Sequence, residues 1–96
     1  MLDIINKFVS RCINNLEGEI TIESVVIYEE SKLEYALSIE NWMASITILS
    51  DFTYDFFIIE IKSEEIKANK TKNFKNIDML FNEIEDDLRC FTNLKN

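Results

Sequence analysis

The sequence predicts one α+β domain over residues 1–96, an antiparallel β-meander of four or five strands with an N-terminal and a C-terminal helix packed on one face. Three observations predict this fold. Apolar residues recur every three to four positions near both ends of the chain, and they alternate at every second position between residues 19 and 61. The segments that join the alternating runs are so short that they can only connect neighbouring antiparallel strands.

The first helix is predicted over residues 3–17. Asp3 can cap its N-terminus, and Gly18, the only glycine of the chain, follows Glu17 where a left-handed C-terminal cap is favoured. The apolar residues share one helix face: Ile5, Phe8, Val9, Cys12, Ile13 and Leu16.

The strand pattern begins at Glu19, slips at Ser24, which predicts a β-bulge, and resumes through residues 25–28. Turns are predicted at 29–31, at Asn41 and at 50–51. With one glycine and no proline, we expect these turns to rely on Asn, Asp and Ser. The strands between them alternate cleanly, so one apolar side is predicted to hold Leu33, Tyr35, Leu37, Ile39, Trp42, Ala44, Ile46 and Ile48.

The run that starts at Phe52 has apolar residues on both faces in its second half, including Phe57 and Ile59, so we expect that half to be covered on both sides. Residues 62–75 are interpreted as a lysine-rich hairpin with a short edge strand around 66–68. Asn76 is predicted to cap the last helix, residues 76–91. Its apolar stripe consists of Ile77, Leu80, Phe81, Ile84, Leu88 and Phe91.

The charge is acidic and unevenly distributed. The net charge is −8, and residues 19–60 carry nine acidic side chains against Lys32 alone. Nucleic acid and anionic membrane would be repelled, so neither is expected as a partner. The acidity favours either solubility alone or a basic protein partner.

Few residues suited to catalysis are available. The chain has no histidine, and one glycine cannot build a phosphate-binding loop. Cys12 and Cys90 are interpreted as buried thiols on helix stripes, with a disulfide between the helices as the alternative. Glu83, Asp86 and Asp87 cluster on the last helix. There Glu83 and Asp87 can share a cation, or all three can simply be solvated. We expect no cofactor, no metal and no enzymatic activity.

The segment 42–56 resembles a hairpin of the TriTu-type immunity proteins of bacterial polymorphic toxin systems, which include contact-dependent inhibition. The likeness rests on Ile46-Thr47-Ile48, on the alternating strand 52–59, and on the positions of the opening and closing helices. Leu49 stands where that family has tryptophan, and Asp51-Phe52 replaces its turn glycine. The resemblance implies a cytoplasmic protein that binds and neutralises a basic toxin domain, of the nuclease class, as a monomer or weak dimer.

The strand alternation sends a set of acidic and small side chains away from the apolar side, and these are the predicted partner-binding residues: Glu34, Glu40, Met43, Ser45, Thr47, Thr53 and Asp55. The alternative function is an acidic secretion chaperone that binds an effector protein and is itself a dimer, with Phe57 and Ile59 suited to the dimer interface. The start Met1-Leu2-Asp3 lacks the basic region of a signal sequence, and no apolar run is long enough to span a membrane, which also favours the cytoplasm.

Overall fold

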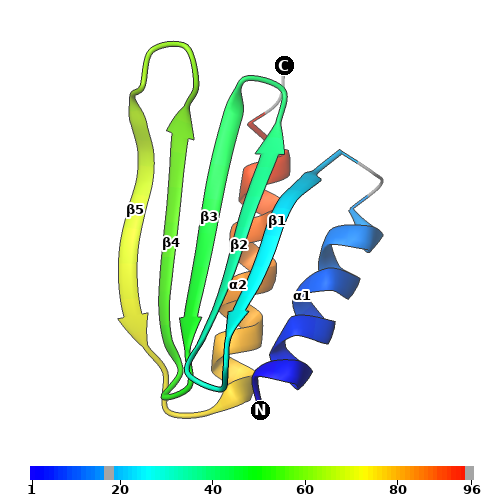
Figure 1. Ribbon diagram of the computed structural model, residues 1–96. Helices are drawn as coiled ribbons and strands as arrows, with labels where there is room; N and C mark the ends of the chain where they lie inside the picture. The colour runs from blue at the N-terminus through cyan, green and yellow to red at the C-terminus, as the bar shows by residue number, and fades with distance from the viewer. Residues whose placement is uncertain (17–18, 95–96) are drawn as a thin grey trace.

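A computed structural model describes residues 1–16 and 19–94 of the chain. Its elements follow the order α1 (Leu2–Asn15), β1 (Thr21–Tyr28), β2 (Lys32–Ile39), β3 (Trp42–Leu49), β4 (Thr53–Glu60), β5 (Ile66–Asn73) and α2 (Ile77–Thr92). The strands form one antiparallel sheet in the order β1-β2-β3-β4-β5. In Figure 1, α2 runs behind the strands and α1 lies at the β1 side of the sheet. The predicted α+β meander is therefore confirmed, with five strands.

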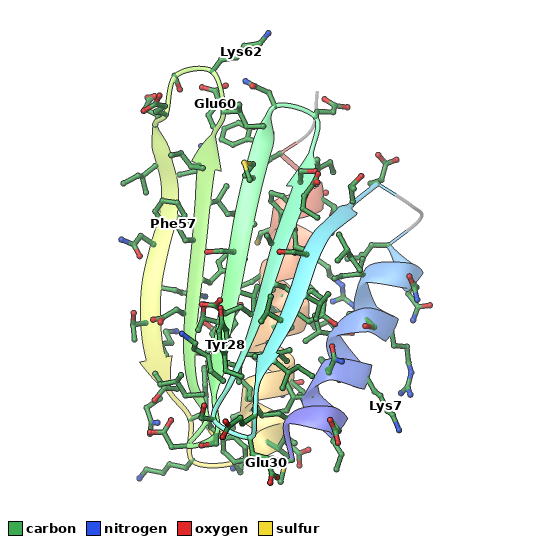
Figure 2. The ribbon with its side chains drawn as sticks, in the orientation of Figure 1. Lys7, Tyr28, Glu30, Phe57, Glu60 and Lys62 are labelled. Atoms are coloured by element: carbon green, nitrogen blue, oxygen red, sulfur yellow. The ribbon has the colours of Figure 1, made fainter. Side chains whose placement is uncertain are left out.

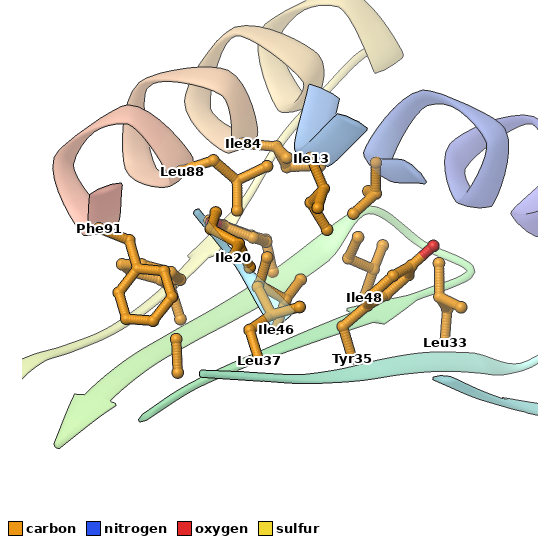
Figure 3. Packing of buried hydrophobic residues seen from close by; sticks show 14 of the residues in the cluster. Ile13, Ile20, Leu33, Tyr35, Leu37, Ile46, Ile48, Ile84, Leu88 and Phe91 are labelled. Carbon is orange, nitrogen blue, oxygen red and sulfur yellow. The ribbon is translucent and has the colours of Figure 1, made fainter. Parts of the chain in front are cut away.

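The core lies between the helix layer and one face of the sheet. Tyr35 pairs with Ile46, and Ile39 pairs with Trp42, so Tyr35 and Trp42 share a face as predicted. Figure 3 shows Ile84 and Leu88 of α2 pointing toward this face of the sheet. Nearly all residues of the predicted apolar side are buried: Leu33, Tyr35, Leu37, Ile39, Ala44, Ile46 and Ile48, with Trp42 partly buried at the margin.

The two helices pack on each other as well as on the sheet. The rings of Phe8 and Phe81 stack with centroids 3.9 Å apart. The Tyr35 hydroxyl reaches α1, where it hydrogen-bonds Ser10 at 2.8 Å and the side chain of Asn6. None of the described helices combines the length and the apolar character that crossing a bilayer requires.

The helix caps were predicted in part. The side chain of Asn76 accepts a hydrogen bond from the Met79 amide at 2.9 Å, which confirms the cap of α2. Asp3 is not the cap of α1, because the helix already begins at Leu2, whose side chain is buried in the core. Asp3 instead lies in the first turn, where its negative charge interacts favourably with the positive end of the helix dipole. Glu17 and Gly18 lie outside the described residues.

The predicted bulge is present, since the register between β1 and β2 shifts between Ile22 and Ser24. The edge strand β5 is longer than predicted and pairs with β4 along Ile66–Asn73. The expectation that both sides of late β4 are covered is wrong. Both helices occupy the core side, so Phe57 and Ile59 lie partly exposed on the other side.

The predicted turn residues are confirmed in part. Ser31 donates a hydrogen bond to the Tyr28 carbonyl at 2.9 Å, and Asp51 accepts one from the Thr53 amide at 3.0 Å. The backbone conformation of the turns differs from the prediction. Left-handed backbone angles occur at Glu29 (φ 52°), Glu40 (φ 50°), Phe52 (φ 69°) and Glu64 (φ 60°), rather than at Asn, Asp or Ser. This conformation costs a non-glycine residue about 1–2 kcal/mol. The register of the buried strands fixes where the chain must reverse, and the residue at that position adopts the conformation that the reversal needs.

Candidate interaction surface

The face of the sheet opposite the helices is not covered by any element of the described chain. Glu34 pairs with Thr47, Thr47 with Asp55, and Asp55 with Thr71. Partners in an antiparallel sheet point to the same face, so these side chains form one row across β2 to β5. We call this uncovered side of the sheet the open face. The row brings together three of the predicted partner-binding residues.

A second group on the open face is apolar. Ser45 pairs with Phe57, and Met43 pairs with Ile59, so these side chains lie in adjacent rows. Met43 is 39% exposed. Figure 2 shows the Phe57 side chain on β4, on the side of the sheet away from the helices. Sequence analysis named Phe57 and Ile59 only for the chaperone alternative and not among the partner-binding residues of this face. Their alternation in step with Thr53 and Asp55 is the signal that places them there.

The remaining predicted residues lie at the ends of the sheet. Thr53 begins β4 on the open face, pairs with Asn73 and accepts a hydrogen bond from its amide at 3.1 Å. Glu40 lies in the turn between β2 and β3, at the opposite end of the sheet from Thr53. The structure therefore gathers six of the seven predicted residues on one face and leaves Glu40 on its rim.

The acidic side chains of the open face are partly engaged with neighbours. Glu34 accepts a hydrogen bond from the Tyr28 hydroxyl at 2.9 Å and lies 3.6 Å from the Lys32 ammonium. That hydrogen bond raises the pKa of Tyr28. Asp55 accepts a hydrogen bond from the Thr71 hydroxyl. These contacts orient the two carboxylates on the open face.

A separate polar network ties α2 to β4 and β5 on the core side. Asp87 accepts hydrogen bonds from the Tyr54 hydroxyl at 2.7 Å and from the Lys70 ammonium at 2.8 Å, and Lys70 also bonds Glu83. The cation that Glu83 and Asp87 share is therefore a lysine, while Asp86 is exposed. No group of three potential ligand residues that could hold a metal occurs among residues 1–16 and 19–94.

The network shifts the pKa values of its members. Burial, followed by the charge of Asp87, raises the pKa of Tyr54. Desolvation lowers the pKa of Lys70, but the hydrogen bonds to Asp87 and Glu83 outweigh it, and the net shift is upward. The hydrogen bond from Lys70 lowers the pKa of Glu83. Each shift stabilises the form already bonded, so the network is a structural clamp between helix and sheet.

The cysteines do not form a reactive centre. Both are free in the structure. Cys12 is half-buried beside a hollow of about 310 Å³ that Glu85 and Arg89 also line, and burial raises the pKa of its thiol, which lowers its reactivity. Cys90 is exposed, which corrects its predicted burial, because Leu88 and Phe91 take the core-facing positions at the end of α2.

The edge strand β1 is the surface that sequence analysis did not anticipate. All eight of its residues are exposed, although five are large and apolar: Ile22, Val25, Val26, Ile27 and Tyr28. Their exposed fractions run from 38% to 44%. In the sequence, this strand appears as an unbroken run of four apolar residues at 25–28, but a buried strand has the same pattern.

Comparison with known proteins gives no relative by which to interpret either surface, because no family model, no curated protein and no solved structure matches the chain.

Proposed function

We propose that this protein is an immunity protein that binds and neutralises a basic bacterial toxin domain, of the nuclease class, by one-to-one association. The observation that carries the proposal is the open face. The net charge of the chain is −8, and its described residues leave one side of the sheet uncovered. The resemblance of segment 42–56 to TriTu-type immunity proteins supports the same assignment.

The composition of the open face suits protein binding. Phe57, Ile59 and Met43 offer an apolar patch toward one end of the face, and the hydroxyls of Ser45 and Thr47 beside it can donate or accept hydrogen bonds. Interfaces combine apolar and polar, hydrated parts in this way. The side chains stand on a hydrogen-bonded sheet, so little backbone conformational freedom is lost when a partner binds.

The charge suits a basic partner. A nuclease holds phosphates in a basic cleft, and an acidic protein can occupy such a cleft in their place. Complementary charge also raises the rate of encounter, toward about 10⁸ M⁻¹s⁻¹ when steering is strong. Fast association matters because an immunity protein must reach the toxin before the toxin reaches its substrate, and the proposal places that encounter in the cytoplasm.

Neutralisation by binding has a quantitative signature. We expect a titration of toxin activity against this protein to reach a sharp endpoint near one equivalent. The toxin to use is the C-terminal domain of a secreted protein encoded immediately beside this gene. Complete inactivation at a small fraction of one equivalent, increasing with time, would mean turnover and would contradict the proposal.

Charge reversal tests the surface itself. The variant Asp55→Lys should slow association by about tenfold at low salt, and much less at high salt, because steering is screened. The matched control is Asp86→Lys, which makes the same charge change on α2 in the helix layer. Equal rates for both variants would remove the open face as the binding surface.

The alternative function, an acidic secretion chaperone, is favoured by one observation, the apolar group around Phe57 and Ile59 on the same face. A chaperone of this kind uses such a patch to dimerise. Sedimentation distinguishes the two functions, because an obligate dimer that dissociates in the variant Phe57→Lys supports the chaperone, whereas a monomer supports the immunity protein.

A further inference from the structure

The outer edge of β1 carries backbone groups that no strand of the described chain pairs. β1 is the first strand in the sheet order, so only its β2 side is hydrogen-bonded in a ladder. Figure 1 shows the strand lying at the margin of the sheet. A strand edge of this kind can template pairing with another extended segment.

The two edges of the sheet differ in their protection. The opposite edge, β5, carries Lys67, Lys70 and Lys72, and lysine is a common guard against strand pairing. Its exposed large apolar residue, Ile66, lies at the first position of the strand. Residues 24–28 of β1 carry no charge at all. The unguarded edge is therefore β1, and it is unguarded along five consecutive residues.

This edge presents apolar side chains on both faces. Val25 pairs with Tyr35, which places it on the core face, whereas Val26 pairs with Glu34 and lies on the open face. Each of the two valines is about 40% exposed. A strand added here would bury apolar area above and below the sheet, and its open-face side chains would extend the surface proposed to bind the partner.

The charges around the edge select the occupant. Glu23 precedes the uncharged segment, and Glu29 and Glu30 follow it. If a second copy paired antiparallel through residues 24–28, Glu23 of each copy would stand opposite Glu29 of the other. Like charges placed opposite each other destabilise a strand pair, and each copy also carries a net charge of −8. A strand with basic residues at both ends would instead place a positive charge opposite Glu23 and another opposite Glu29, and opposite charges stabilise a strand pair.

We propose that the β1 edge accepts an extended segment of the partner protein as an added strand, with aliphatic residues at alternate positions and Lys or Arg at both ends. The backbone supplies the hydrogen bonds, Val25 and Ile27 meet aliphatic side chains on the core face, and Glu23 and Glu29 meet the basic ends. This inference deepens the proposed function and rests on it for the source of the strand. That β1 has an unpaired outer edge follows from the fold alone.

The test uses a synthetic peptide of sequence KTVTVTK, acetylated and amidated, whose palindromic order suits either strand direction. Titrated into the ¹⁵N-labelled full chain, it should shift the amide signals of residues 24–28 and slow their hydrogen exchange, with a Kd of about 0.1–1 mM. Signals of β5 should stay unchanged. The same peptide N-methylated at every residue should not bind, because it lacks the backbone donors.

Two matched comparisons isolate the charge and the edge. The peptide ETVTVTE should bind about tenfold more weakly than KTVTVTK. The variant Val26→Lys should weaken KTVTVTK about tenfold, whereas Asn69→Lys, the same kind of change on β5, should have less than a twofold effect. Thermal unfolding of both variants checks that each is folded.

Several results would overturn the inference. One is unchanged amide signals at residues 24–28 in several millimolar peptide. Another is equal affinity for KTVTVTK and ETVTVTE. A third is a concentration-dependent dimer that Val26→Lys abolishes, because a second copy would then be the occupant of the edge. The proposed function fails separately. If Val26→Lys still titrates the toxin with a sharp equimolar endpoint and an unchanged association rate, strand addition is wrong and immunity stands. If KTVTVTK binds at β1 while wild-type protein leaves the toxin active, the edge is real and immunity is wrong.

Discussion

Asp87 is the buried acid on which the contact between α2 and the sheet depends. The residue is 8% exposed, and its two carboxylate oxygens accept hydrogen bonds from the Tyr54 hydroxyl at 2.7 Å and from the Lys70 ammonium at 2.8 Å. The side chain of Tyr54 is fully buried. Replacing Asp87 by alanine therefore removes an acceptor from a donor that water cannot reach.

The magnitude follows from these contacts. A hydrogen bond to a charged group contributes about 1.5–3 kcal/mol, and a buried donor left without a partner costs about 1–3 kcal/mol. The two terms overlap, because both describe the lost bond to Tyr54, and Lys70 keeps Glu83 as a partner. We expect Asp87→Ala to lower the free energy of unfolding by about 3 kcal/mol, which is roughly 12–24 °C in Tm for a domain of this size.

Urea unfolding followed by the fluorescence of Trp42, the only tryptophan, measures this loss. The control is Asp86→Ala, an exposed neighbour on the same helix, which should cost less than about 0.5 kcal/mol. In a double-mutant cycle, Tyr54→Phe and Asp87→Ala should couple by about 1 kcal/mol. Equal stabilities for the Asp87 and Asp86 variants, or additivity within about 0.3 kcal/mol in the cycle, would refute the clamp.

Three further outcomes are expected. Ile46→Ala should lower the free energy of unfolding by about 2–5 kcal/mol in urea, whereas Ser45→Ala beside it should change it by less than about 0.5 kcal/mol; similar costs would contradict the assigned faces. The folded state raises the pKa of Tyr54, so thermal stability should fall as pH rises from about 10, and the slope should lessen in Tyr54→Phe. The bond from Lys70 lowers the pKa of Glu83, so the stability it contributes should be present above pH ~4.3 and lost as pH falls below it; an acid profile unchanged in Glu83→Gln would contradict this.

The sequence predicted the local structure well wherever one physical pattern dominated. The alternation of Leu33 through Ile48 defined a buried face, and the slip at Ser24 defined a bulge, because side chains on a strand alternate strictly between its two faces. Asn76 defined a helix start, because its side chain can accept a hydrogen bond from a free backbone amide of the first turn. These features depend only on residues close together in the chain.

The candidate surface was predictable in part. The alternation that defined the core also placed Glu34, Thr47 and Asp55 on the other side of the sheet. It could not reveal that they form one row, because the row depends on the register between strands. Phe57 and Ile59 were misjudged for a related reason, since their apolar character suggested a cover that neither helix provides.

What the sequence alone determined is therefore the set of elements, the apolar face of the sheet and the acidic character of the chain, all of which follow from residue spacing and charge. What only the tertiary structure decided is which surfaces stay uncovered. Both helices pack on one face, so the other face is open, and β1 remains an edge with Val25 and Val26 about 40% exposed. Coverage depends on contacts between distant segments, and a strand that lacks a cover has the same sequence pattern as one that is buried.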